Sequence, residues 1–148
     1  MDTVTAFQVI AHEANRIPFA PEDIAGRWNS EGRRVIYASC AASTALLEFL
    51  AHLESSLPEA LACSRVILRP ADVEALERLP DGWRERPYRA DVQAVGDRWL
   101  DERRSLALRV PSVVAPASYN VLINPEHPDF GQVAVEFTES FRLDSRLA

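Results

Sequence analysis

Lysine is missing from this sequence of 148 residues, in which all 16 basic residues are arginine. With 22 acidic residues the formal net charge at pH 7 is −6. An acidic chain is a poor non-specific binder of nucleic acid, because such binding needs a basic surface. Arginine is, however, the better of the two basic residues for bidentate recognition of phosphate. We therefore expect no direct contact with nucleic acid.

Cysteine is scarce, and long apolar runs are absent. Cys40 and Cys63 lie in different segments without a CxxC motif, so no metal site is expected. No early stretch joins a basic start to an apolar core, as a signal peptide would. No apolar run approaches the ~18–20 residues of a membrane span. These features predict a cytoplasmic protein with reduced thiols and no membrane partner.

Two common nucleotide-binding motifs are also missing. The sequence contains neither GxGxxG nor GxxxxGK[ST], so neither a Rossmann site nor a P-loop is supported. The length and the 47% share of hydrophobic residues are those of an ordinary globular chain. We expect one domain that covers residues 1–148.

The stretch from Gly26 to Leu53 joins three kinds of element without a gap. Residues 26–32 are rich in Gly, Asn and Ser and predict an irregular polar turn. Val35–Ala38 is β-branched and aromatic enough for a buried strand. Ala41–Ser55 predicts a helix that is stopped by Pro58. A turn, a strand and a helix in this order can hold Arg27, Tyr37 and Glu48 around one pocket.

The rest of the chain predicts short strands at both ends and helices in the middle. Within the central helix, i, i+3, i+4 spacing places Leu46, Phe49, Leu50, Leu53 and Leu57 on the expected core face. Further helices are expected at Asp72–Leu76 and at Ala90–Arg104, where Gly96 would allow a close contact. Strands are expected at Thr3–Ile10, Ser64–Arg69, Ser105–Val110, Val113–Val114, Tyr119–Ile123, Gln132–Phe137 and Ser140–Leu143. Without regular βαβ alternation, this favours an α+β fold with mainly antiparallel sheets and helices inserted mid-chain.

Several motifs resemble, in order, those of the RES domain family, which is named for an Arg, a Glu and a Ser. They are GRWN at 26–29, VIYAS at 35–39, LLE at 46–48 followed by HL, GDRWL at 96–100, VPSVV at 110–114, NVLINPEHPDF at 120–130 and FRLDSRL at 141–147. Each motif alone is weak, but their order over nearly the whole chain makes chance similarity improbable.

The resemblance implies a fold like that of ADP-ribosyltransferase toxins and a role as the toxin of a bacterial toxin–antitoxin pair. It implies NAD+ as the substrate, and an antitoxin partner with a helix-turn-helix DNA-binding part. The eponymous residues fall on Arg27, Glu48 and Ser112, and the pocket tyrosine falls on Tyr37. Gln8 stands where the family usually has an arginine, which removes one cationic contact.

These residue types suit the cleavage of the bond between nicotinamide and ribose. That cleavage passes through a cationic, oxocarbenium-like ribose, which the carboxylate of Glu48 would stabilise. Arg27 would bind the diphosphate through its planar fork, and Tyr37 would stack on nicotinamide with its hydroxyl at the rim of the pocket. Ser112, Ser39 and Gln8 are further candidate contacts to NAD+. His52, one helical turn from Glu48, could tune that carboxylate.

The residues alone leave simpler roles open. Glu48 could be a solvated glutamate on a helix face. Arg27 could form an ion pair at the surface, and Tyr37 could be a core residue of its strand. The leading hypothesis is an NAD-dependent mono-ADP-ribosyltransferase that modifies a cellular protein. The alternatives are an NAD glycohydrolase or phosphorylase that uses water or phosphate as acceptor, and a non-catalytic domain that only binds its antitoxin.

Overall fold

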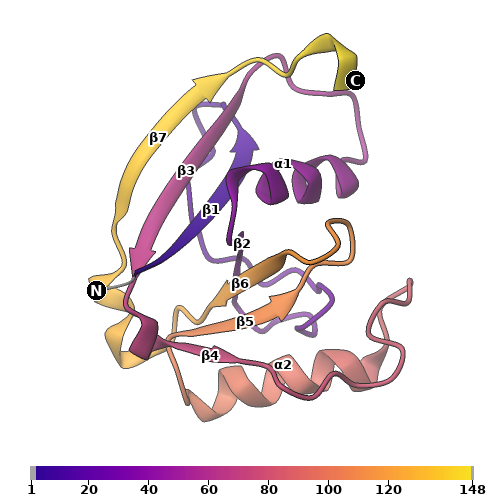
Figure 1. The fold of residues 1–148 in the computed structure, drawn as a ribbon, viewed down its shortest axis with the longest axis vertical. Coiled ribbons are helices and arrows are strands. Elements are labelled where there is room, and N and C mark those ends of the chain that lie inside the picture. Colours follow the sequence, from indigo (N-terminus) through magenta and orange to yellow (C-terminus); the bar gives the residue numbers. More distant parts are fainter. Residues whose placement is uncertain (1–2, 148) are drawn as a thin grey trace.

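A single seven-stranded sheet forms the centre of the computed structural model, which describes residues 3–147 (Figure 1). The strands are β1 Val4–Ala11, β2 Ile36–Ser39, β3 Leu61–Leu68, β4 Val73–Ala75, β5 Ala107–Pro111, β6 Tyr119–Ile123 and β7 Val135–Phe141. Their order is β4-β5-β6-β2-β1-β3-β7, and only the β4–β5 pair is parallel. The helices are α1 Ala42–Ala51 and α2 Ala90–Glu102, with 3₁₀ turns η1 Pro70–Asp72, η2 Pro128–Gln132 and η3 Ser145–Leu147. The predicted α+β class with a mainly antiparallel sheet is confirmed.

Four of the expected elements differ in the structure. The helix expected at Asp72–Leu76 is wrong: after η1 the chain forms β4, which finds a parallel partner in β5. The strand expected at Val113–Val114 is a turn, in which the backbone N–H of Ser112 donates to Ser118. The two strands expected near the C-terminus are one, because β7 continues along β3 to Phe141. For β4 and β7 a partner strand distant in sequence decides the backbone conformation, whereas the turn after β5 is closed by local hydrogen bonds.

The central helix ends earlier than expected, at Ala51, and buries different residues. Its fully buried residues are Thr44 and Ala45, whose small side chains allow α1 to approach β1 closely. The apolar stripe expected to face the core is only partly buried. Phe49, and Leu53 just beyond the helix, also line a cavity. The predicted core face is therefore confirmed in part: Leu46 and Phe49 pack against a core cluster, and the stripe also serves as a cavity wall.

Strand register places both helices on the same face of the sheet. Phe7, Ser39, Asn120 and Val110 form one row across β1, β2, β6 and β5, and paired residues point to the same face. Phe7 packs in the cluster that includes α1, and Val110 in the cluster that includes α2. Figure 1 shows α1 beside β1 and α2 along β4 and β5. Ser39 and Asn120 therefore lie between the two helices.

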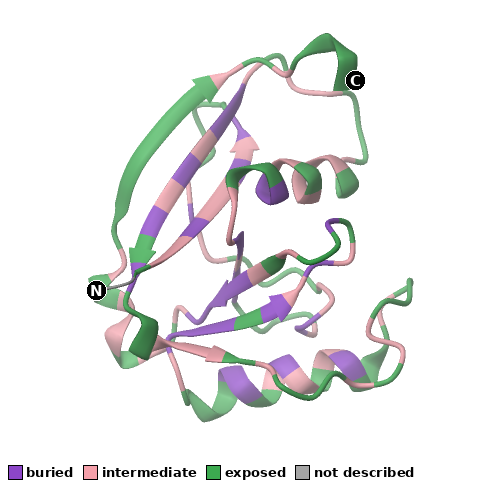
Figure 2. Ribbon diagram, viewed as in Figure 1, coloured by how far each residue is buried: buried purple, intermediate pink, exposed green. Residues whose placement is uncertain are grey.

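The opposite face of the central strands holds another large part of the core. Ala6, Ile36, Val66 and Val121 are buried there, and Phe19 packs over them from the loop before β2. The strand β7, by contrast, is exposed along almost its whole length (Figure 2).

Within residues 3–147, no helix is both long enough and apolar enough to cross a bilayer.

Helix α2 packs directly onto the turn that follows Gly26. Trp28 is 2% exposed and stacks on Trp83 with ring centroids 6.4 Å apart. A Cβ placed on Gly96 would lie 1.7 Å from the carbonyl oxygen of Trp28, so only glycine fits at this point of the helix. The expected close contact at Gly96 is confirmed, and its partner is the GRWN turn.

We predict that Gly96→Ala lowers the free energy of unfolding by about 2–3 kcal/mol, since the added methyl group meets backbone that cannot move freely. Gly131→Ala is the matched control, because a Cβ there has nothing within 4 Å. The control should change stability by less than about 0.5 kcal/mol. Urea titrations of both variants measure the difference. Equal midpoints for the two would refute the close helix–turn contact.

Candidate active site

A cavity of about 1130 Å³ lies beside α1 and the turn at 26–28, and residues from both faces of β1 and β2 line it. This volume is slightly above the usual range of small-molecule sites, about 300–1,000 Å³. Among its lining residues are Gln8, Arg27, Tyr37, Ser39, Glu48, His52, Arg84, Arg86, Tyr88 and Asn120. The structure thus brings five of the six predicted site residues to one cavity. The sixth, Ser112, lies behind Glu48.

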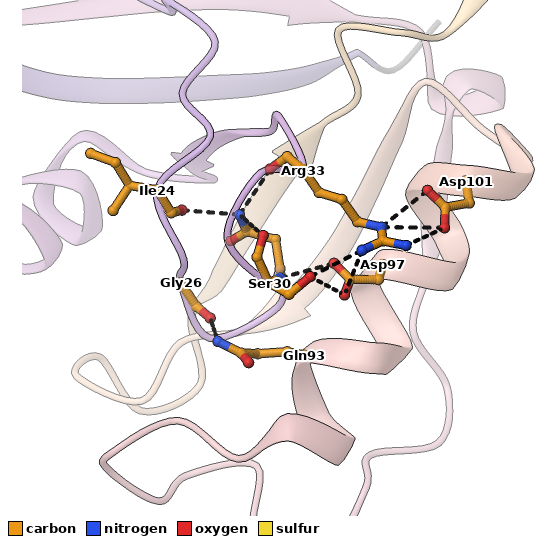
Figure 3. Close-up of polar contacts among 8 residues, drawn as sticks. Ile24, Gly26, Ser30, Arg33, Gln93, Asp97 and Asp101 are labelled. Atoms are coloured by element: carbon orange, nitrogen blue, oxygen red, sulfur yellow. Dashed lines mark hydrogen bonds and ion pairs between the residues drawn. The ribbon is translucent and has the colours of Figure 1, made fainter.

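Side chains of α2 hold the turn that presents Arg27. Gln93 donates to the carbonyl oxygen of Gly26 at 2.9 Å (Figure 3). Asp97 accepts from the backbone N–H of Ser30 at 2.9 Å and from its hydroxyl at 2.6 Å. The polar residues that predicted an irregular turn therefore have defined partners on a rigid helix. Their hydrogen bonds fix the direction in which the turn points.

Tyr37 joins strand β2 to the inside of the same turn. Its hydroxyl donates to Oδ1 of Asn29 at 2.7 Å and accepts from the backbone N–H of Trp28 at 3.0 Å. Burial raises the pKa of Tyr37 well above its usual value, so the hydroxyl stays protonated at neutral pH. The hydroxyl is committed to the turn and is not at the rim of the pocket as expected. The ring remains the part of Tyr37 that can meet a ligand.

Arg27 is anchored at one end of its guanidinium group. Nη1 donates to the carbonyl oxygens of Trp83 at 2.6 Å and of Glu85 at 3.1 Å. The guanidinium carbon lies 4.9 Å from the centroid of the Tyr88 ring. Burial lowers the pKa of Arg27, although an arginine stays charged at any physiological pH. Among residues 3–147, Nε and Nη2 have no hydrogen-bond partner, so these donors can serve a ligand.

Glu48 projects from α1 and is held by two donors from the sheet side. Its Oε2 accepts from the hydroxyl of Ser112 at 2.9 Å and from Nδ2 of Asn120. The hydroxyl of Ser39 donates to Oδ1 of Asn120 at 2.8 Å and so fixes the orientation of that amide. Glu48 keeps 21% of its side chain exposed. The oxygen Oε2 is therefore held in place by the protein, whereas the position of Oε1 is less constrained.

Ser112 has a different position from the one expected. Its hydroxyl also accepts from the backbone N–H of Ala115 at 3.1 Å and is 5% exposed as a residue. The structure therefore places Ser112 on Glu48, where it orients the carboxylate. Asn120, which reasoning from the sequence missed, does the same from β6. The signal was available, since Asn120 opens the NVLINPEHPDF motif.

His52 and Tyr88 connect the Glu48 side of the cavity to the Arg27 side. Nδ1 of His52 lies 2.8 Å from the carbonyl oxygen of Glu48, which can only accept, so Nδ1 carries a proton. In the neutral imidazole Nε2 is then an acceptor, and the hydroxyl of Tyr88, 3.2 Å away, donates to it. Nδ1 is also 3.9 Å from Oε1 of Glu48. Tyr88 lies in a loop without periodicity, and the sequence offered no signal for it.

Gln8 fills the place where β1 and β2 diverge. These strands share a single register pair, Phe7 with Ser39. The Gln8 amide donates to the carbonyl oxygen of Tyr37 at 3.1 Å and accepts from the backbone N–H of Phe19 at 2.6 Å. Both ends of the amide are thus used within the protein.

Within the described chain, no group of three or more His, Cys, Asp or Glu residues could hold a metal ion.

Comparison with known proteins identifies the family of this chain. The model of the RES domain family matches residues 6–144. A curated relative named Toxin Res, from Pseudomonas putida, is 36% identical over 128 residues, which cover 84% of this chain and 86% of the relative. A second relative, named Prs ADP-ribosylating toxin, from Sphingobium sp., is 33% identical over 128 residues, which cover 82% and 80%.

These matches define a class of protein, the RES toxins, and this chain belongs to the RES domain family. The predicted family and toxin class are therefore confirmed. The fold also resembles a chain in the crystal structure of the M. tuberculosis MbcT–MbcA toxin–antitoxin complex. That match has a TM-score of 0.72 and 18% identity, and covers 98% of this chain and 86% of the other.

We predict that Asn120→Asp destabilises the fold by about 2 kcal/mol or more near neutral pH, since a donor becomes a second carboxylate beside Glu48. Repulsion raises the pKa of one carboxyl of this pair, so the folded variant takes up a proton as the pH falls. The deficit in melting temperature should therefore shrink between about pH 7.5 and pH 5. Asn15→Asp, on an exposed residue, is the control. A deficit that does not change with pH would contradict the contact.

Proposed function

We propose that this chain is a toxin that cleaves NAD+ between nicotinamide and ribose and transfers ADP-ribose to a cellular protein. The observation that carries the proposal is the pair formed by Glu48 and Arg27, one anion and one cation that line the same large cavity. The name of the Sphingobium relative, an ADP-ribosylating toxin, supports the same chemistry.

Glu48 would supply the negative charge that the reaction needs. Nicotinamide leaves as a neutral group, so the step requires no general acid, and positive charge grows on the ribose. A carboxylate held beside that ribose stabilises the charge most when its position is fixed in advance. The hydrogen bonds from Ser112 and Asn120 to Oε2 provide this fixed position. Oε1 is then available for a ribose hydroxyl or for the developing cation.

Arg27 would hold the diphosphate of NAD+ away from the reacting bond. Its two remaining donors, Nε and Nη2, form the planar edge that binds a phosphate with two hydrogen bonds. The carbonyl oxygens of Trp83 and Glu85 fix the other side of the guanidinium. Binding energy from the diphosphate would thus orient the ribose toward Glu48. The Tyr37 ring offers an apolar surface for nicotinamide.

The acceptor decides between transferase and hydrolase. Water or phosphate would give an NAD glycohydrolase or phosphorylase, which uses the same Glu48 and Arg27. We favour a protein over water or phosphate as the acceptor, because the Sphingobium relative bears the name of an ADP-ribosylating toxin. Gln8, whose amide is used inside the protein, contributes no free cation that would bind a phosphate acceptor.

We further propose that a cognate antitoxin, with its own helix-turn-helix DNA-binding part, covers the mouth of the cavity. The related M. tuberculosis fold is known from a toxin–antitoxin complex. Ile17 and Ile24 line the cavity and are 71% and 69% exposed, which gives an apolar rim. An antitoxin segment could cover this rim and place an acidic group on Arg27. DNA binding would come from the antitoxin, because this chain is acidic.

We predict that Glu48→Gln lowers the rate of nicotinamide release from NAD+ by roughly 100-fold or more while the protein stays folded. Glu77→Gln, the same change on an exposed residue away from the cavity, should keep full activity. The assay incubates each purified protein with NAD+ labelled in the adenylate part and a cell lysate.

Label on a protein band supports the transferase. Free ADP-ribose or its phosphate supports the glycohydrolase or phosphorylase. Unchanged NAD+ with the wild-type protein supports the non-catalytic domain and contradicts the proposal.

We also predict that Ile17→Asp with Ile24→Asp weakens antitoxin binding by at least about tenfold, since two apolar contacts are replaced by solvated charges. The affinity for NAD+ should change little, because Arg27 and Glu48 are intact. Arg27→Ala should lower the affinity for both the antitoxin and NAD+. Calorimetric titrations with the antitoxin and with NAD+ make the comparison. Full antitoxin affinity in the double variant would place the antitoxin elsewhere.

A further inference from the structure

Arg27 and Arg86 stack on the same tyrosine ring, that of Tyr88. The guanidinium carbons of Arg27 and Arg86 lie 4.9 Å and 5.6 Å from the centroid of the same Tyr88 ring. Both arginines line the cavity. They come from segments about sixty residues apart, so their meeting is a product of the fold. The ring face, which attracts cations, keeps two like charges close together.

Neither cation is neutralised by a salt bridge within residues 3–147. The contrast with Arg89 in the same loop is clear, because Arg89 pairs with Glu85 at 3.2 Å and with Asp91 at 2.9 Å. Burial lowers the pKa of Arg27, and the positive charge of Arg86 acts in the same direction. Two unpaired guanidinium groups at the wall of a cavity create a site that favours an anion with two charges.

Hydrogen bonds support this pair from the end of α1 and from the loop 83–88. The hydroxyl of Tyr88 bonds to His52, just beyond the end of α1. Arg27 is held by carbonyl oxygens of Trp83 and Glu85 from the loop that carries Arg86 and Tyr88. The loop 83–88 and the turn at 26–28 therefore form one unit. A ligand bound between the two arginines would lie at a fixed distance from Glu48.

We propose that Tyr88 holds Arg27 and Arg86 as a two-arginine clamp for the diphosphate of the dinucleotide. The choice of dinucleotide rests on the function proposed above, but the chemistry of the clamp is that of any diphosphate. Each guanidinium presents a planar edge, and a diphosphate has one negative charge on each phosphorus centre when esterified at both ends. Arg86 is thus a binding residue, and Tyr88 a positioning residue that acts through both arginines.

The test uses ADP-ribose, which carries the diphosphate and cannot lose nicotinamide, together with adenosine and inorganic pyrophosphate. Arg86→Gln should weaken ADP-ribose and pyrophosphate binding by at least about tenfold, the loss expected for a charge-assisted hydrogen bond. Adenosine binding should change less than about twofold, because adenosine has no phosphate. Arg98→Gln is the matched control, since Arg98 is exposed on α2 and outside the cavity.

Two changes at Tyr88 separate the clamp from a merely structural role. Tyr88→Leu removes the ring and should reproduce the loss seen with Arg86→Gln. Tyr88→Phe keeps the ring, loses only the hydroxyl bond to His52 and should retain ADP-ribose affinity. Circular dichroism and thermal melting confirm that each variant is folded.

The outcomes distinguish the clamp from the function on which it rests. Wild-type affinity for ADP-ribose in folded Arg86→Gln would overturn the clamp and leave the NAD+ chemistry standing. Pyrophosphate binding that depends on Arg86, without any binding of ADP-ribose, would support the clamp and contradict the dinucleotide. Binding of neither ligand by the wild-type protein would overturn both.

Discussion

The hydrogen bonds that Ser112 and Asn120 donate to the carboxylate of Glu48 connect the two parts of this molecule. They matter because β1 and β2 share one register pair, which leaves the two halves of the sheet weakly joined. Helix α1 packs on β1 and reaches across to β6 through Glu48. Thr44, near its start, bonds to Ser118 at 2.6 Å and adds to the connection. The geometry of the site is thus also a condition of the fold, and hydrogen bonds to a charged group are worth about 1.5–3 kcal/mol each.

Motifs that lie far apart in the sequence meet in the fold, and together they support Arg27. The glycine of GDRWL contacts Trp28 of the GRWN segment, and its aspartate contacts Ser30, the residue that follows that segment. Asn124, from the NVLINPEHPDF motif, is fully buried and donates to the carbonyl oxygen of Leu100 at 3.0 Å, which ties β6 to α2. Much of the family pattern is therefore structural. Only a few of its residues, Arg27 and Glu48 above all, face the cavity.

Elements set by local sequence were predictable, and those set by distant partners were not. The strand at Tyr119–Ile123 and helix α2 follow from periodicity and from nearby prolines, and the structure has them. The segment at Val73–Ala75 has a helix-like pattern but forms a strand, because β5 offers it a parallel partner. The same distinction holds at the site. Arg27, Tyr37 and Glu48 lie in one stretch of chain and were found together. Asn120 joins them through long-range strand register, and only its place in the NVLINPEHPDF motif pointed to it. Tyr88 joins them through loop contacts that no local pattern encodes.

The central claim is that Glu48 and Arg27 face opposite ends of one NAD+ molecule. A crystal structure of the Glu48→Gln protein with NAD+ tests it most directly, because we expect the variant to bind the substrate and to consume it much more slowly. We predict nicotinamide ribose beside residue 48 and the diphosphate at Arg27, with the nicotinamide ring against Tyr37. A dinucleotide in another part of the molecule, or one bound with its ribose turned away from residue 48, would contradict this account.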